Sequence, residues 1–482
     1  MILIITGCKE ENILANETLI DDDFNKLDLE KLNHYYIEAE LNYENKTYKA
    51  KQNIVYVNNT DKILGELYFH IYPNAFKTLE TAPILFSGAS ETSISYKGGY
   101  MDIKGIFTDN RQLKYKIKGE ENTILHIKLD KPLMKGEKVD IYMEYEVVLP
   151  TTKDRFGYGD RVINCGNWYP IACVYDENGW NLDSYYKLGD PFYSDVANYN
   201  VKINTDKDVI IGSSGNILSE TIEGNGRTYE IEGKLIRDFA WVASKDFKIA
   251  ESYVDGTRIK LYYLDKKDSM IKHSLQIGGD SLKTFNKLFG KYPYGTYSIV
   301  MTEFPSGMEY PGIVFIGEEY FRNSLIDALE QIIVHETAHQ WWYGLIGNDQ
   351  IDEAWLDEAL ATYSEIIYYK EKYGVEKGKE YFIQNIKIGY EFGKDYLIGD
   401  NIVNKPIEDF IGWDDYGILV YTKGAMFINE IQEIYGEDIL YEILKTYFKR
   451  YKFYNATTED FIRVCEDITK SDFTDLVNKW LY

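Results

Sequence analysis

One short motif combines residue types and a spacing that suit a zinc site. Residues 335–339 read His335-Glu-Thr-Ala-His339, and the ten residues before them favour a helix. On a helix, positions i and i+4 lie one turn apart on the same face, so both imidazoles can reach one metal ion. Glu336 can reach a metal-bound water without binding the metal itself. The alternative is a pair of core histidines that are hydrogen-bonded on a buried helix.

A glutamate on the next predicted helix supplies a candidate third ligand. Glu358 lies on an otherwise apolar helix face, where an unpaired carboxylate would be costly and therefore needs a cation or a donor. Gly344 and Gly347 permit a sharp reversal between the two helices. Two histidines and one glutamate leave the fourth position of a catalytic zinc open for water. Glu365, seven residues further on, can accept the second N–H of a ligand histidine, or it is a solvated surface carboxylate.

The bulk composition predicts a globular protein of two or more domains. The chain has 482 residues, of which 45% are hydrophobic and 27% charged. Its formal net charge of −25 predicts that it binds no nucleic acid, since no run of Lys or Arg forms a basic patch. The acidity indicates solubility above all, and it would also suit a substrate with a free amine. The oligomeric state and the preferred substrate side chain are not encoded in any pattern that we recognise.

The pattern of apolar residues changes from period two to helical spacing near residue 254. Alternation over 34–56 predicts a hairpin, and alternation over 138–147 predicts a strand with one wet face. Helical spacing follows at 268–288, interrupted at Gly278-Gly279, then at 324–343, 353–371, 418–435 and on to Tyr482, with a strand at 297–301. We therefore predict an α+β multidomain fold: a lead-in over 1–30, an antiparallel β domain over 31–253 and a mainly helical domain with a small sheet over 254–482.

The first eight residues end in Ile5-Thr6-Gly7-Cys8, which is similar to a bacterial lipobox. The apolar run lacks a basic n-region and is shorter than a signal h-region, so either the start is misassigned or the match is accidental. Membrane contact is expected only through a lipid anchor at Cys8. The two locations that follow are the bacterial cell surface, as a lipoprotein, and the cytoplasm. Cys165 and Cys173 either pair across a short loop or remain buried thiols.

The zinc motif resembles that of the gluzincin aminopeptidases, the family of aminopeptidase N. Their signature is His-Glu-x-x-His, eighteen residues, then Glu, and residues 340–357 supply those eighteen here. Glu358 lies in Trp-Leu-Asp-Glu-Ala, like the family's Trp-Leu-Asn-Glu-Gly. The resemblance implies one zinc per chain, held by His335, His339 and Glu358, with Glu336 as the general base.

Two further motifs point to the same family. Ser306-Gly307-Met308-Glu309-Tyr310 is similar to the family's Gly-x-Met-Glu-Asn, which implies that Gly307, Met308 and Glu309 bind the amino terminus of the substrate. A carboxylate also suits that role on physical grounds, because it binds an ammonium through charge-assisted hydrogen bonds. Ser306 and Tyr310 depart from the pattern. Tyr421-Thr-Lys-Gly matches Tyr-x-Lys-Gly, which implies that Tyr421 stabilises the tetrahedral intermediate. Tyr416 matches a second tyrosine of some members.

The resemblance implies a curved, saddle-like N-terminal β domain and a thermolysin-like catalytic domain. Many members continue into a C-terminal helical domain, and this sequence resembles a short bacterial form without it. The implied function is a zinc aminopeptidase that acts on peptides with a free N-terminus. The alternatives are a gluzincin endopeptidase or other hydrolase, and a non-catalytic protein that keeps the fold. The family also uses a second amine anchor from the N-terminal domain, for which residues 164–170 are the first place to look.

Overall fold

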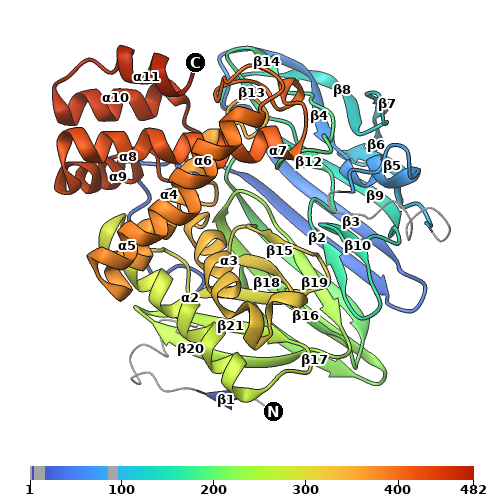
Figure 1. Cartoon of the computed structure of the whole chain (residues 1–482). Coiled ribbons are helices and arrows are strands. Elements are labelled where there is room, and N and C mark those ends of the chain that lie inside the picture. Colours follow the sequence, from blue (N-terminus) through green and yellow to red (C-terminus); the bar gives the residue numbers. More distant parts are fainter. Residues whose placement is uncertain (1–2, 5–16, 85–95) are drawn as a thin grey trace.

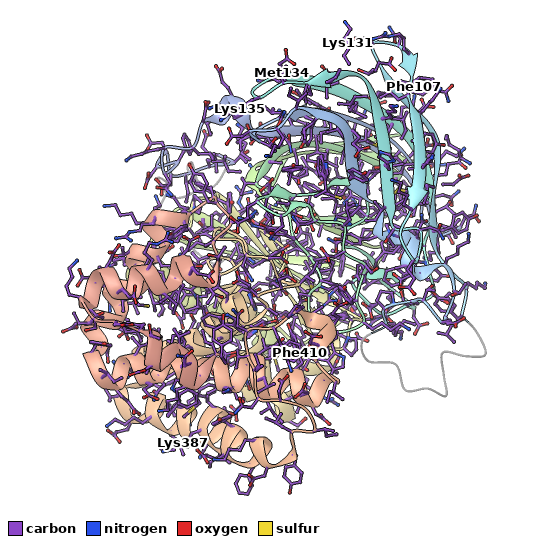
Figure 2. The ribbon with its side chains drawn as sticks, turned by 90° about the horizontal axis from the view of Figure 1, so that it is seen from above. Phe107, Lys131, Met134, Lys135, Lys387 and Phe410 are labelled. Atoms are coloured by element: carbon purple, nitrogen blue, oxygen red, sulfur yellow. The ribbon has the colours of Figure 1, made fainter. Side chains whose placement is uncertain are left out.

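The structure, a computed structural model, describes residues 3–4, 17–84 and 96–482 (Figure 1). Cys8, the predicted lipid-anchor site, lies outside the described residues, as do all of residues 1–2 and 5–16 of the predicted lead-in. Figure 2 shows the strands that carry Phe107 and Lys131 at one end of the molecule and the helical part with Lys387 at the other. The predicted fold class is confirmed: a β-rich N-terminal half precedes a mainly helical half with one small sheet.

The N-terminal half is built on a curved eight-stranded sheet. Its strands lie in the order β17 (Asn216–Glu223), β18 (Gly226–Ile236), β15 (Ala197–Asp206), β2 (Asn33–Asn42), β3 (Thr47–Val57), β9 (Lys138–Val148), β5 (Tyr100–Thr108) and β6 (Arg111–Gln112). Neighbouring strands are antiparallel except for the β15–β2 pair. The predicted hairpin over 34–56 is β2–β3, in which every second side chain of β2 is buried. The alternation of apolar and polar residues predicted these strands correctly, because one face of this sheet covers the core.

Smaller sheets complete the N-terminal half. One four-stranded sheet contains β12 (Ile171–Ala172), β4 (Leu64–His70), β8 (Ile124–Leu133) and β7 (Lys114–Lys118), and another contains β10 (Phe156–Tyr158), β11 (Ile163–Cys165), β19 (Trp241–Ser244) and β16 (Ile210–Ser213). A short ribbon pairs β13 (Tyr175–Asp176) with β14 (Gly179–Trp180). Cys165 and Cys173 are buried free thiols and form no disulfide.

The helical half contains a six-stranded sheet. Its order is β1 (Leu3–Ile4), β20 (Lys248–Val254), β21 (Thr257–Tyr263), β22 (Thr296–Thr302), β24 (Ile313–Gly317) and β23 (Gly307–Met308). The turn at Asp255–Gly256, near which we placed the domain boundary, joins β20 to β21 within this sheet, and both turn residues have positive φ. The boundary at residue 254 stays a prediction. Helices α2 and α3 lie in front of this sheet in Figure 1.

The helices follow the predicted order with two local differences. They are α2 (Asp268–Leu288), α3 (Ile326–Ala338), α4 (Trp355–Tyr373), α5 (Val375–Tyr381), α6 (Ile388–Gly393), α7 (Trp413–Tyr416), α8 (Gly424–Tyr435), α9 (Glu437–Tyr451), α10 (Thr458–Thr469) and α11 (Thr474–Trp480). Helix α2 is unbroken at Gly278-Gly279, where a side chain on Gly278 would clash with Ile299 of β22. These glycines therefore allow close packing on the sheet and do not interrupt the helix. The described helices include none long and apolar enough to span a membrane.

Short helices of other types connect these elements. The 3₁₀ segments are η1 (Leu29–Lys31), η2 (Tyr72–Lys77), η3 (Glu318–Tyr320), η4 (Asn323–Leu325), η6 (Lys394–Tyr396) and η7 (Ile407–Asp409), and the π-helical segments are η5 (Phe382–Lys387) and η8 (Gly417–Lys423). The predicted helix over 324–343 ends earlier, at Ala338. The amide of Gly344 bonds back to the carbonyl of His339, and Tyr343 has φ of 104°. This turn reverses the chain and lets α4 return alongside α3.

Two buried side chains fasten the N-terminal half to the helical half. Glu303, just after β22, accepts the backbone N–H groups of Asp160, Arg161 and Val162 at 2.8–3.1 Å. Arg237, just after β18, is fully buried and donates to the carbonyls of Tyr343, Ser194 and Tyr454 at 2.6–3.2 Å. The first of these carbonyls belongs to the turn that follows α3. These bonds fix the position of the N-terminal half against the helices of the site.

We expect Arg237→Met to lower the free energy of unfolding by about 3 kcal/mol, because three carbonyls, two of them buried, lose their charged donor. Urea unfolding followed by tryptophan fluorescence measures the change. Arg450→Met is the matched control: Arg450 forms an exposed ion pair with Asp467, and such pairs contribute less than about 1 kcal/mol. Equal losses in the two variants would contradict the role assigned to Arg237.

Candidate active site

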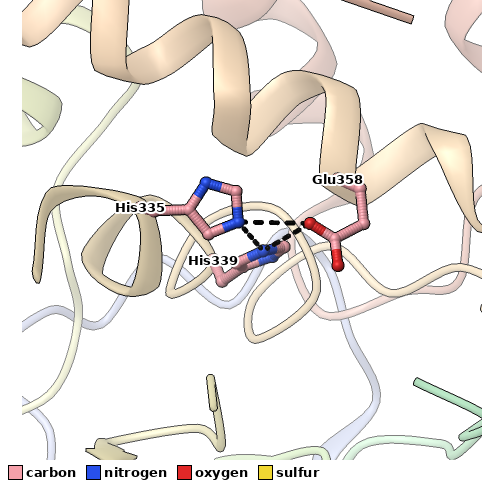
Figure 3. A group of neighbouring side chains, drawn as sticks. All are labelled: His335, His339 and Glu358. Atoms are coloured by element: carbon pink, nitrogen blue, oxygen red, sulfur yellow. Dashed lines mark hydrogen bonds and ion pairs between the residues drawn. The ribbon is translucent and has the colours of Figure 1, made fainter. Parts of the chain in front are cut away.

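The structure brings the three predicted zinc ligands together (Figure 3). His335 lies in the last turn of α3, His339 follows that helix directly, and Glu358 lies in the first turn of α4. The two imidazole Nε2 atoms are 3.1 Å apart, and each is 3.2 Å from Oε2 of Glu358. A tetrahedral zinc with ligand distances of about 2.0–2.1 Å separates its ligand atoms by about 3.3–3.4 Å. The spacing of the three atoms fits such an ion.

The hydrogen bonds of the two imidazoles fix where their protons lie. Nδ1 of His339 is 3.0 Å from the carbonyl of Trp342, which can only accept, so this nitrogen carries the proton. Nδ1 of His335 is 2.7 Å from Oε1 of Glu365 and donates to it in the same way. Both Nε2 lone pairs therefore point at Glu358 Oε2 with no donor between them. Three converging lone pairs need a cation, so the donor set fits a bound zinc.

The electrostatics of the ligand group lead to the same conclusion. Burial disfavours the charged form of His339, but the adjacent Glu358 carboxylate outweighs burial and raises the pKa of His339 to about 10. Burial also opposes the charge on Glu358, yet the histidines hold the pKa of this carboxyl well below its usual range. The group thus attracts positive charge, and a divalent cation can replace the protons that the imidazoles would otherwise take up.

Glu365 lies behind the first histidine. Its carboxylate is buried and lies in α4, accepting from His335 through Oε1 and from the hydroxyl of Tyr381 through Oε2. Its burial excludes the solvated surface alternative. Tyr381 of α5 was not predicted, because it lies on a helix that carries no recognisable motif. Glu365 and Tyr381 together hold the imidazole of His335 in position through these hydrogen bonds.

Glu336 lies beside the ligand group on the wall of a cavity of about 550 Å³. It is buried, and its Oε2 has no hydrogen-bond partner among the described residues. Burial raises the pKa of Glu336 to about 8. Gly307 of β23 makes room for this carboxylate, since a Cβ at Gly307 would clash with Oε1. Gly307 therefore shapes the site through the absence of a side chain.

Two further buried carboxylates line the same cavity. Glu309 follows β23, and Asp190 comes from an irregular segment of the N-terminal half. Burial and the proximity of Asp190 raise the pKa of Glu309 to about 7, and burial raises the pKa of Asp190 to about 7 despite its ion pair with Arg155. Arg155 also donates from Nε to Sδ of Met308 at 3.0 Å. Two buried carboxylates near one cationic side chain leave negative potential for a ligand cation.

Asp190 and Arg155 were not predicted, and the segment that we singled out lies elsewhere. Residues 164–170 do not line the cavity. Tyr310, which departs from the family motif, packs against this segment: its hydroxyl donates to Asn167 at 3.0 Å and lies where a side chain on Gly166 would be. Asp190 lies in irregular chain without periodicity, so no local signal identified it.

The two tyrosines that the motifs singled out, Tyr421 and Tyr416, differ in their position relative to the cavity. Tyr421, on η8, lines the cavity, and its hydroxyl donates to Oε1 of Glu358 at 2.7 Å. Its ring lies 5.9 Å from the ring of His335. Tyr416 is buried, packs against Tyr421 with ring centroids 5.9 Å apart, and does not line the cavity. Tyr416 therefore supports Tyr421 and does not contact the cavity itself.

Asp357, which replaces the family's asparagine, is also buried near the ligands. It accepts from Gln350 at 2.7 Å and from Asn348 at 3.0 Å. Gln350 also donates to Glu309 Oε1 at 3.4 Å, and it therefore links Asp357 to Glu309 on the cavity wall. The substitution thus keeps a hydrogen-bonded side chain at this position.

Comparisons with known proteins agree with this fold. Residues 273–480 match the Peptidase family M1 domain. The chain is 25% identical over 273 residues to human endoplasmic reticulum aminopeptidase 2, a match that covers 52% of this chain and 28% of that protein. It is 28% identical over 203 residues to aminopeptidase N of Streptomyces lividans, covering 39% and 23% respectively. The chain therefore matches only about a quarter of the length of these relatives.

A solved structure shares the whole fold. The M1 zinc metallopeptidase from Deinococcus radiodurans superposes with a TM-score of 0.67 and 12% identity, and the match covers 94% of each chain. A match at this identity shows the fold alone, while the family match rests on sequence. Residues 273–480 of this chain therefore match the peptidase family M1 domain, and the chain is similar in sequence to aminopeptidase N-like zinc metallopeptidases.

Proposed function

We propose that this protein is a zinc-dependent aminopeptidase that hydrolyses the first peptide bond of peptides with a free amino terminus. The observation that carries the proposal is one cavity that holds both the ligand group and two buried carboxylates, Glu309 and Asp190. A metal-binding group alone would suit many hydrolases. Buried carboxylates at a fixed place beside it suit a substrate whose positive charge lies next to the bond to be cleaved.

His335, His339 and Glu358 would hold one zinc ion per chain, and Glu365 would orient His335. When bound, zinc supplies Lewis-acid polarisation of the scissile carbonyl and of the attacking water. Glu336 is the general base in this proposal: its unpartnered Oε2 accepts the proton of the attacking water. The same carboxyl then donates this proton to the nitrogen of the leaving amine.

Glu309 and Asp190 would bind the α-ammonium of the substrate. Arg155 holds Asp190 in place through its ion pair and holds the Glu309 segment through Met308. Fixing the amine in this way places the first peptide bond beside the ligand group. The binding of the amine thereby orients the bond that is to be cleaved. Gly307 contributes by leaving space for the Glu336 carboxylate.

Tyr421 would stabilise the oxygen on which negative charge develops. In the structure its hydroxyl donates to Glu358 Oε1, so the donor already lies beside the ligand group. Turning this hydroxyl from Glu358 to the substrate oxygen supplies a hydrogen bond where charge appears. Tyr416 limits the movement of the Tyr421 ring by packing against it.

The role of Glu365 predicts a graded loss of zinc affinity. Competition against a fluorescent zinc chelator should show one zinc per chain in the unmodified protein. Affinity should fall by about 10–100-fold in Glu365→Gln, because the carboxylate that orients His335 is lost. His126→Gln is the matched control, since His126 also pairs with a carboxylate, Glu66 at 2.7 Å, but on the surface. Unchanged affinity in Glu365→Gln would remove Glu365 from this role.

Replacing the proposed base should separate metal binding from turnover. We expect Glu336→Gln to keep zinc and to lower kcat by about 10²–10⁴-fold, because general acid–base catalysis contributes on that scale. Metal analysis and steady-state hydrolysis measure the two quantities on the same preparation. Asp327→Asn, at an exposed position of the same helix, should change neither. Near-normal turnover in Glu336→Gln would refute the general-base assignment.

The proposed activity is tested with a panel of aminoacyl fluorogenic amides, each with a free and an acetylated amino group. We expect cleavage of the free-amine set alone, because Glu309 and Asp190 bind an ammonium group and an acetylated nitrogen carries no charge. This activity should be lost on treatment with a zinc chelator and restored by zinc. Cleavage of the acetylated set would indicate an endopeptidase. Inactivity of zinc-loaded protein on every substrate would instead favour a non-catalytic role.

A further inference from the structure

Helix α6 and the residues after it expose a set of large apolar side chains next to the cavity. We call this set the apolar lip: Ile388, Phe392, Tyr396, Ile398 and Ile411. Phe392 is 68% exposed and Ile398 83% exposed. Single exposed apolar residues are ordinary, whereas a contiguous group indicates a contact surface.

The members of the apolar lip are neighbours in space as well as in sequence. Ile388, Phe392 and Tyr396 recur at intervals of four residues, the spacing that aligns side chains along one face of a helix. Ile411 joins them from a separate segment, since a Cβ on Gly399, the residue after Ile398, would lie 3.0 Å from its side chain. The set is therefore one surface.

The packing of α6 explains why this surface stays exposed. Gly389 and Gly393 face η8: a Cβ on Gly389 would lie 3.6 Å from Thr422, and one on Gly393 only 2.7 Å from Ile418. The glycines let the two helical segments approach closely. Because the glycine face is used for this packing, the neighbouring face with Ile388 and Phe392 remains free.

Residues close in sequence to both ends of the apolar lip line the cavity. Ile386 lines the cavity two residues before Ile388, and Trp413 lines it two residues after Ile411. Thr422, against which Gly389 packs, lines it as well. The apolar lip therefore continues the cavity wall outward onto the surface.

We propose that the apolar lip binds the part of a peptide substrate that lies beyond the residues held in the cavity, and that the protein favours peptides with apolar side chains there. The inference rests on the proposed aminopeptidase function. A cavity of about 550 Å³ has the size that encloses a small ligand, so a longer peptide must pass its mouth. With its amine held by Glu309 and Asp190, such a peptide meets the apolar lip as it leaves.

The test compares two pentapeptides that begin with the residue ranked best in the aminoacyl amide panel. Two glycines follow, and the last two positions are phenylalanine in one peptide and serine in the other. We expect kcat/KM to be about tenfold higher for the phenylalanine peptide, because burying part of two apolar side chains stabilises on that scale. The double variant Phe392→Ser, Ile398→Ser should reduce the ratio to near one. Ile222→Ser, an exposed residue of β17 that is 55% exposed, should keep it.

Each outcome supports or overturns the inference. Turnover of the aminoacyl amide with equal kcat/KM for the two pentapeptides would overturn the inference and leave the proposed function standing. A ratio that survives in the double variant would also overturn it. Sedimentation of both proteins identifies the remaining alternative: a self-association that the double variant loses, together with an unchanged ratio, would assign the apolar lip to a second copy of the chain. Absence of amide turnover would refute the proposed function and the inference with it.

Discussion

Three lone pairs converge within 3.2 Å of one another between α3 and α4, and the arrangement of the site depends on this convergence. Such a group is unfavourable unless a cation fills it, because each atom repels the other two. The fold holds it through bonds on the far sides of the imidazoles, from Glu365 and from the carbonyl of Trp342. Because Trp342 belongs to the turn after α3, the early end of that helix is a condition for the ligand geometry.

Several glycines in and around the site allow close packing because they have no side chain. A side chain on Gly307 would displace the Glu336 carboxylate, and one on Gly166 would displace the Tyr310 hydroxyl. Gly189, next to Asp190, approaches the hydroxyl of Tyr416 in the same manner. At each of these positions a side chain of the site or of its surroundings occupies the volume that a Cβ would take. The functional groups are therefore packed as closely as the hydrophobic core, which limits the movement of each.

The features that could be predicted from the sequence are those that depend on the spacing of nearby residues. His335 and His339 share a helix face, and Glu358 and Glu365 share the next, so helical periodicity sufficed to group them. Alternating residues likewise revealed the β2–β3 hairpin. Asp190 and Arg155 could not be predicted in this way, because they lie far apart in the sequence and only the three-dimensional fold brings them to Glu309. The end of α3 and the π-helical turn that carries Tyr421 were also missed, since helical spacing continues through both segments.

The hydrogen bonds of Glu303 and Arg237, which hold the two halves together, also fix the distances between groups of the site that come from different halves. Asp190 belongs to one half and Glu309 to the other, whereas the ligand group belongs wholly to the second. Because buried hydrogen bonds hold the halves together, the distance from Asp190 and Glu309 to the ligand group is set by the protein and does not adapt to a ligand. Under the proposed function, a peptide whose backbone is longer by one methylene before the first bond, as in a β-amino acid, would present the wrong atom to Glu336.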